Sequence, residues 1–147
     1  MKTIMQIVKM KGKEIWTTTP NQSVFEALKL MAEKDIGALP VLDGKKLVGI
    51  FSERDYARKV ILKGKSSKKT PVGEIMSTTI IMIPPEQTTE LGLALMTAKH
   101  VRHLPVIQKE KLVGFISIGD LVKSIIDEQK LEINKMGQYI SEKVGFN

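Results

Sequence analysis

The chain has 147 residues, of which 42% are hydrophobic and 27% charged, with a formal net charge of +7 and no cysteine. This composition is ordinary for a globular protein with one compact core, and the lack of cysteine excludes disulfides and thiolate-bound zinc. The two histidines, His100 and His103, argue against a histidine-based metal site, because carboxylates would have to supply the remaining ligands. No apolar run approaches the roughly 20 residues that span a bilayer, and we expect a cytoplasmic protein that does not associate with membranes.

The first part of the chain predicts a β-α-β-β-α unit. Ser23 and Glu26 have the spacing of a helix-capping box, and apolar residues follow at helical spacing. The dipeptide Asp43-Gly44 is typical of a tight turn between two strands. The predicted elements are a short helix or strand at 3–11, a strand at 15–18, a helix at 23–34, strands at 39–42 and 46–51, and a helix at 52–62.

A linker and a second unit follow. Four lysines lie within Lys63–Lys69, and we interpret this stretch as part of a solvated linker. A nucleic-acid patch is the alternative, although no aromatic residues are interleaved with these lysines. The elements predicted after the linker are a strand at 79–83, a helix at 88–99, strands at 103–107 and 111–117, and a helix from 118 that continues into the tail.

The two units are copies of one sequence. Residues 20–55 overlay residues 85–120 at an offset of 65 without a gap, and 15 of the 36 positions are identical. Such an internal repeat predicts related ligand sites in the two halves. The predicted fold is α/β, of the α+β type, with two tandem β-α-β-β-α repeats packed sheet to sheet with pseudo-two-fold symmetry. The predicted parts are a first repeat with its lead segment (1–62), a linker (63–75), a second repeat (76–127) and a helical tail that packs on a neighbour (128–147).

The segments GIFSERD and GFISIGD end the two hairpins, and each places an aspartate three residues after a serine at a helix start. Ser52 with Asp55, and Ser117 with Asp120, can simply cap their helices. The same groups can also bind a ligand, because a helix N-terminus favours phosphate and a carboxylate accepts hydrogen bonds from a ribose diol. The residues alone leave both readings open.

The positions before the hairpins differ between the copies. Arg102-His103 precedes the second hairpin, where the first copy has the small pair Gly37-Ala38. Basic groups at a strand entrance can clamp phosphates, and small residues leave room for a flat base. The first copy carries its own cations, Arg54 and Arg58, near the start of its second helix. This pattern predicts a cleft between the copies that holds an anionic ligand.

With GALPV and RHLPV before the turns and GIFSERD and GFISIGD after them, the repeat resembles a tandem pair of CBS domains, called a Bateman module, over about residues 3–127. The resemblance extends to stand-alone CBS proteins of bacteria and plant organelles. It implies a non-catalytic sensor that binds AMP, ADP, ATP, NAD(H) or S-adenosylmethionine between the repeats, forms a homodimer and regulates an unidentified partner protein. No catalytic constellation is evident, which agrees with a protein that is not an enzyme. The alternative is a nucleic-acid-binding or scaffold protein that uses the basic surface.

The resemblance also assigns roles to individual residues. Asp55 and Asp120 match the ribose-binding acid, and Arg102, His103 and Arg54 match positions that reach phosphates. Because Gly37-Ala38 lacks the basic pair of the second copy, the two sites should differ in affinity or in ligand. Together, the residue patterns and the resemblance predict ligand contacts at Thr17, Thr18, Ile36, Gly37, Ala38, Ser52, Arg54, Asp55, Arg58, Ser77, Thr79, Ile81, Val101, Arg102, His103, Ser117 and Asp120.

Overall fold

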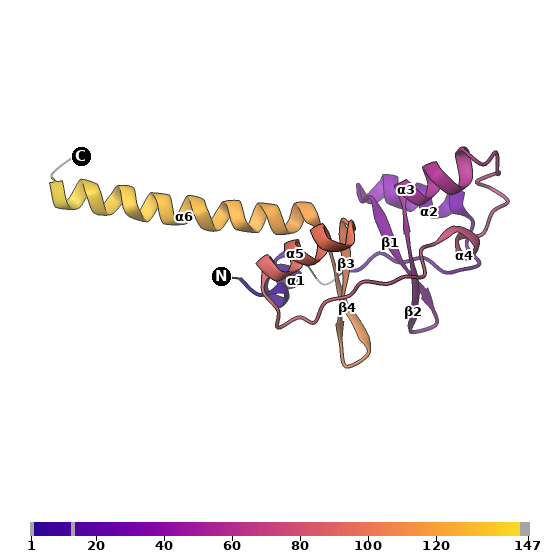
Figure 1. The fold of residues 1–147 in the computed structure, drawn as a ribbon, viewed down its shortest axis with the longest axis horizontal. Helices are drawn as coiled ribbons and strands as arrows, with labels where there is room; N and C mark the ends of the chain where they lie inside the picture. The colour runs from indigo at the N-terminus through magenta and orange to yellow at the C-terminus, as the bar shows by residue number, and fades with distance from the viewer. Residues whose placement is uncertain (1, 13, 145–147) are drawn as a thin grey trace.

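The computed structural model describes residues 2–12 and 14–144 and shows two β-hairpins side by side with helices around them (Figure 1). The elements of the first half are α1 (Ile4–Lys11), α2 (Val24–Lys34), β1 (Ala38–Asp43), β2 (Lys46–Ser52), α3 (Glu53–Tyr56) and the π-helical turn η1 (Ala57–Ile61). Those of the second half are α4 (Val72–Ile75), α5 (Thr89–Lys99), β3 (His103–Gln108), β4 (Lys111–Ser117) and α6 (Ile118–Val144). The mixed α/β fold and both predicted hairpins are confirmed.

The two hairpins have the same register. β1 pairs antiparallel with β2, and β3 pairs antiparallel with β4, each as a two-stranded sheet. The register shifts once in each hairpin, between Val41 and Leu42 and between Val106 and Ile107. These two positions are related by the sequence offset of 65, so the repeat is preserved down to its β-bulge.

The leading strand expected in each copy is reduced to a single bridge. Thr18 pairs with Val41 and Ile83 pairs with Val106, both in parallel, and no strand forms at 15–18 or 79–83. In each copy a proline follows shortly, at Pro20 or Pro84, and proline has no N–H with which to extend a ladder. The prediction of full strands at these positions was therefore wrong, although the chain there is placed along the hairpin as expected.

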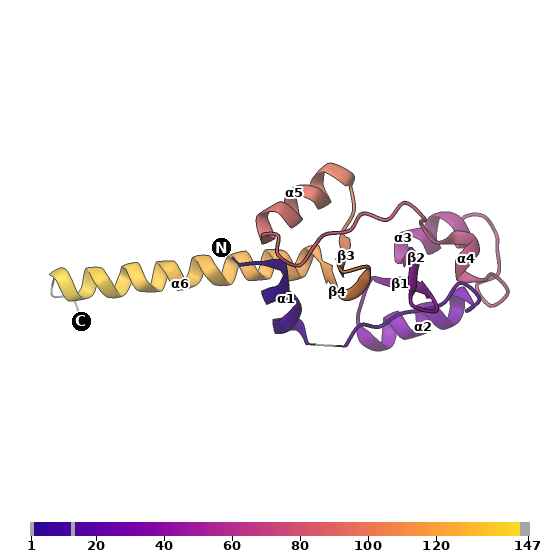
Figure 2. The same ribbon diagram turned by 90° about the horizontal axis from the view of Figure 1, so that it is seen from below.

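With one exception, the helices form where their capping residues predicted them. Ser23 accepts a hydrogen bond from the Glu26 N–H at 3.1 Å and starts α2. The helix expected at 52–62 is instead a single α-helical turn followed by the π-helical turn η1. α6 continues into the tail without a break as far as Val144, in line with the prediction, and extends away from the rest of the molecule (Figures 1 and 2). That the tail packs on a neighbour remains a prediction.

Each half of the molecule has its own core, and the lead segment belongs to the second one. Phe51 and Met31 are buried in the first core, to which Val72 of α4 contributes. Ile4 and Ile7 of α1 are buried in the second core, so α1 packs beside β4 and α6 (Figure 2). The segment that precedes each repeat thus completes the core of the other one, which ties the two copies together.

Candidate functional site

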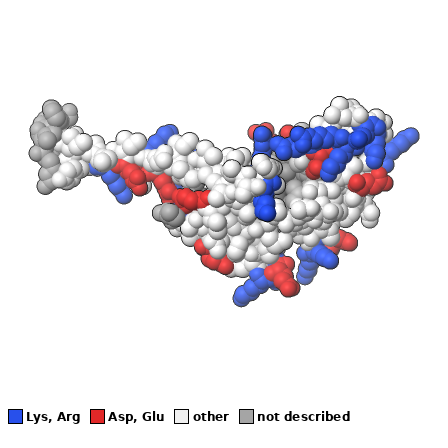
Figure 3. All heavy atoms as spheres, in the orientation of Figure 1, with Lys and Arg blue, Asp and Glu red and all other residues white. Residues whose placement is uncertain are grey.

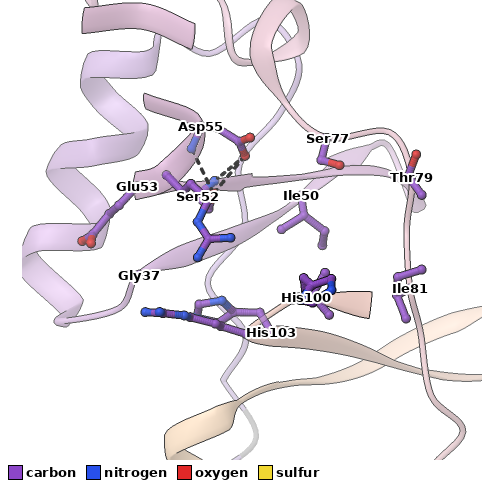
Figure 4. Close-up of a pocket in the computed structure, with 13 residues that line it drawn as sticks. Gly37, Ile50, Ser52, Glu53, Asp55, Ser77, Thr79, Ile81, His100 and His103 are labelled. Carbon is purple, nitrogen blue, oxygen red and sulfur yellow. Dashed lines mark hydrogen bonds between the residues drawn. The ribbon is translucent and has the colours of Figure 1, made fainter. Parts of the chain in front are cut away.

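A pocket of about 340 Å³ lies between the two hairpins (Figure 4). Its residues come from the ends of the strands, the start of α3 and the extended segment after α4. Both copies contribute, as expected for a site between tandem repeats. The lining residues are Gly37, Ile50, Ser52, Glu53, Arg54, Asp55, Ser77, Thr79, Ile81, His100, Val101, Arg102 and His103.

A capping box at the start of α3 forms one wall. The Ser52 hydroxyl accepts from the Asp55 N–H at 3.1 Å, while the Ser52 N–H and hydroxyl both donate to Asp55 Oδ2 at 3.0 Å. The other carboxylate oxygen of Asp55 lies 3.0 Å from Lys59 Nζ. Both groups therefore cap the helix and also line the pocket, so the two readings of this motif are compatible.

The segment after α4 forms the opposite wall by pairing with the edge of β2. Ile50 N–H donates to Ser77 O at 3.0 Å, and Ser77 N–H donates to Ile50 O at 2.8 Å. The chain can approach this closely because Gly49 has no side chain: a Cβ there would lie 2.9 Å from Ser77 O and 2.5 Å from Met76 Sδ. Glycine at this position thus sets the place of the wall that carries Ser77 and Thr79.

His103 lies at the second-repeat side of the pocket and is neutral at pH 7. Its ring stacks on Phe115, with centroids 5.4 Å apart and planes at 10°, and a Cβ placed on Gly37 would lie 3.6 Å from its Cε1. Burial and the nearby cation Lys11 lower the pKa of His103 to about 4, and Arg102 adds to this, while Asp120 opposes it. The positive charge on this side of the pocket is therefore that of Arg102, not of the predicted pair.

The pocket brings together most of the predicted ligand residues. Those that line it are Gly37, Ser52, Arg54, Asp55, Ser77, Thr79, Ile81, Val101, Arg102 and His103. The remaining predicted residues do not line it: Thr17 and Thr18 border a separate groove beside α2, Ala38 is buried in β1, Ile36 packs against the first core, Arg58 is exposed on η1, and Ser117 and Asp120 lie at the start of α6.

Three pocket residues were not predicted from the sequence. Ile50 alternates with the buried Phe51 along β2, so strand periodicity could have placed it on the open face. Glu53 begins α3 and extends away from the side where Ser77 and Thr79 lie (Figure 4). His100 ends α5 in the left-handed conformation at φ 56°, and no sequence pattern indicated that it would face the pocket.

The second Ser/Asp pair has a different environment. Ser117 and Asp120 form the same reciprocal hydrogen bonds, at 2.8 and 3.1 Å. Here, however, Lys11 Nζ donates to Asp120 Oδ2 at 2.8 Å and to Phe115 O at 2.9 Å. Burial works to raise the pKa of Asp120, but the hydrogen bonds from Lys11 and Ser117 outweigh it and hold the pKa below its ordinary value. Asp55 and Asp120, to which the resemblance assigns the same role, thus have different environments.

Charged side chains are unevenly distributed over the surface of the molecule. Figure 3 shows Lys and Arg side chains gathered over the region of α3, η1 and the following loop. Arg54, at the pocket, adjoins this region, so an anion approaching the pocket meets a positive potential. Within the described residues, no cluster of histidines and carboxylates could hold a metal ion, and no helix there has the length and apolarity needed to cross a membrane.

The family model of the CBS domain matches the chain twice, at residues 8–62 and 72–127. A mitochondrial CBS domain-containing protein of Arabidopsis thaliana, CBSX3, is 38% identical over 94% of this chain and 71% of its own. The CBS domain-containing protein YhcV of Bacillus subtilis is 35% identical over 74% of this chain and 76% of its own.

Solved structures of proteins with CBS domains have the same fold as this chain. A protein with CBS domains from Burkholderia ambifaria superposes with a TM-score of 0.84 at 53% identity, over 87% of this chain and 96% of its own. The CBS-domain containing protein ATU1752 from Agrobacterium tumefaciens superposes at 0.79 with 32% identity, over 84% of this chain and 98% of its own. Both cover the two repeats.

Proposed function

The chain belongs to the CBS-domain family, with two CBS domains in tandem, and we propose that it is a non-catalytic regulatory module that binds an adenine nucleotide in the pocket between them. The ligand would stabilise one relative arrangement of the two repeats, and a partner protein would recognise that arrangement. The ligand can shift this equilibrium only as far as its affinities for the two arrangements differ.

The observation that carries this proposal is the set of groups that meet in one pocket. Asp55 and Ser52 supply acceptors and a hydroxyl for a ribose, and Arg54 and Arg102 supply cations for phosphate. Ile50, Ile81 and Val101 supply an apolar surface for a flat base. The volume of about 340 Å³ falls within the range of small-molecule sites.

The two arginines favour a phosphorylated ligand. Four charged residues line the pocket: Glu53, Asp55, which is paired with Lys59, and the two arginines Arg54 and Arg102, which are the cations available to a phosphate because His103 is neutral. AMP, ADP or ATP fits this charge, and NAD(H) is the next candidate. S-adenosylmethionine carries a cationic sulfonium and fits less well. The CBS pair of protein MJ0100 was crystallised with 5′-methylthioadenosine and S-adenosyl-L-methionine, but at 24% identity that likeness speaks for the fold alone.

Several wider expectations belong to the same proposal. The homodimer, the regulated partner and the cytoplasmic location remain predictions, and the Arabidopsis relative is described as mitochondrial. The nucleic-acid alternative is not favoured, since the family match covers both halves of the chain. A lysine-rich loop beside a nucleotide pocket also serves to attract a small anion.

The test is thermal melting of the pure protein against AMP, ADP, ATP, NAD⁺, NADH and S-adenosylmethionine. A ligand at 100 times its Kd stabilises the folded state by about 2.7 kcal/mol, which raises the melting temperature by several degrees. We expect a clear rise with at least one adenine nucleotide. No rise with any of the six compounds at millimolar concentration would contradict the proposal.

Asp55→Ala is expected to weaken binding of that nucleotide by about tenfold or more, since a hydrogen bond to a charged group contributes about 1.5 to 3 kcal/mol. Isothermal titration calorimetry measures the Kd. Asp43→Ala, which removes the same charge from an exposed turn, is the matched control and should leave the Kd unchanged. Equal affinity of the Asp55→Ala variant and the wild-type protein would exclude the ribose-binding role.

A further inference from the structure

The repeat predicts a second position in the other half of the molecule that is related to the pocket. The offset of 65 relates the pocket residues Ser77, Ile50 and Asp55 to Gly12, Phe115 and Asp120. If the halves were equivalent, the segment at Gly12 would pair with β4 as the segment at Ser77 pairs with β2.

Among the described residues, that pairing is missing and Lys11 takes its place. Phe115 O, which corresponds to the Ile50 carbonyl bound by the Ser77 N–H, accepts instead from Lys11 Nζ at 2.9 Å. Ile50 and Ser77 form a bridge, and no bridge joins Phe115 to Gly12. The Lys11 ammonium group thus takes the place of the backbone N–H donor. The pocket wall that Ser77 forms beside β2 therefore has no equivalent beside β4 among the described residues.

The ammonium group of Lys11 also forms an ion pair with the carboxylate of Asp120. Lys11 Nζ lies 2.8 Å from Asp120 Oδ2, which already accepts from the Ser117 N–H, so this oxygen is engaged twice. In the open pocket the corresponding Asp55 is engaged as well, by Ser52 on Oδ2 and by Lys59 of η1 on Oδ1, but Lys59 donates to Ile75 O and not to the Ile50 carbonyl, and Asp55 lines the cavity. Lys11 is the last residue of α1, which packs against β4, and its ammonium group therefore reaches both Phe115 O and Asp120.

The aromatic surface of this half is covered as well. His103 stacks on Phe115 at 5.4 Å, whereas Ile50, the counterpart of Phe115, faces the open pocket. His103 itself corresponds to Ala38 in the first copy, which has no ring to place over Ile50. In the first half the Ile50 carbonyl accepts from the Ser77 N–H and no ring corresponds to His103, whereas the acid there is also paired with a lysine, Lys59.

We infer that Lys11 closes the second ligand position and limits the protein to one nucleotide per chain. This inference rests on the proposed nucleotide binding, and it replaces the expectation of two unequal sites with one open site and one closed by an internal cation. Lys11→Met should open the second position, because methionine is the residue found at the corresponding place in the other half, Met76.

Calorimetric titration with whichever of AMP, ADP or ATP gives the largest rise in melting temperature counts the sites. We expect a stoichiometry near one for the wild-type chain and near two for Lys11→Met, with the second site weaker. Lys9→Met, which removes an exposed charge from the same helix, is the control and should stay near one. Lys11→Arg should also stay near one, because it keeps a cation at this place.

The outcomes separate the two proposals. A wild-type stoichiometry of two overturns the closure by Lys11, and so does a folded Lys11→Met variant that still binds one nucleotide. No heat of binding with any nucleotide overturns the proposed function instead. Should the Lys11→Met variant fail to fold, the wild-type stoichiometry still decides, because two sites per chain are incompatible with a closed second position.

Discussion

Replacing Gly49 with alanine is expected to lower the free energy of unfolding by about 1 to 3 kcal/mol, the usual cost of overpacking, and to weaken nucleotide binding by about tenfold or more. The added methyl group would lie 2.5 Å from Met76 Sδ and 2.9 Å from Ser77 O. Met76 can turn aside at little cost, but the Ser77 carbonyl belongs to a backbone bridge with Ile50. Relief of the contact therefore moves the wall of the pocket.

Gly114→Ala is the matched control, because Gly114 holds the same place in the other hairpin. There the new methyl group would lie 2.5 Å from Val8 Cγ2, a side-chain contact in the second core. We expect a similar loss of stability, measured by urea unfolding, with the Kd for nucleotide unchanged. If both variants bind equally well, the approach of the chain at Gly49 does not position the pocket wall.

The stability of the protein is expected to fall by about 2 kcal/mol between pH 7 and pH 5 because of His103. Its pKa in the folded state is about 4, below the ordinary value of 6.5. Between these two values the unfolded chain binds a proton at this histidine and the folded chain does not, so acid favours unfolding. The loss begins as the pH falls through about 6.5 and is complete near 4.

The groups facing His103 confine this effect to the stated window. The pKa of Asp120 is held below its ordinary value of 3.8, so that carboxylate titrates at lower pH. His103→Gln should therefore abolish most of the loss between pH 7 and pH 5, as measured by urea unfolding at both values. An equal loss in the variant and the wild-type protein would assign the effect to groups other than His103.

Local pattern was enough to predict the repeat, the hairpins and the charged and hydroxyl groups of the pocket, while the family resemblance added Ser77, Thr79, Ile81 and Val101. The alternation of residues along β2, the turn at Asp43-Gly44 and the serine caps act over a few residues, so the sequence alone indicates them. The offset between the copies then predicted that Ser52, Asp55 and Arg102 would face a common cleft, and they line one pocket.

Local pattern was insufficient to decide whether a residue only caps a helix or also lines the pocket, because this depends on neighbours far away in the sequence. Ser52 with Asp55 and Ser117 with Asp120 have the same spacing and the same capping bonds, yet only the first pair lines the pocket. The difference comes from Lys11, which is more than 100 residues away along the chain from Asp120. It reaches that carboxylate only because α1 completes the core of the opposite repeat.

The sequence by itself thus determined the unit, its duplication and the residues available for a ligand, because these depend on periodicity and short-range caps. Tertiary structure alone decided which copy each lead segment joins, how closely Ser77 approaches β2, and that His103 is partly buried and neutral. These outcomes depend on packing between segments far apart in the chain, where the environment of a side chain, and not its type, sets its charge and its access to a ligand.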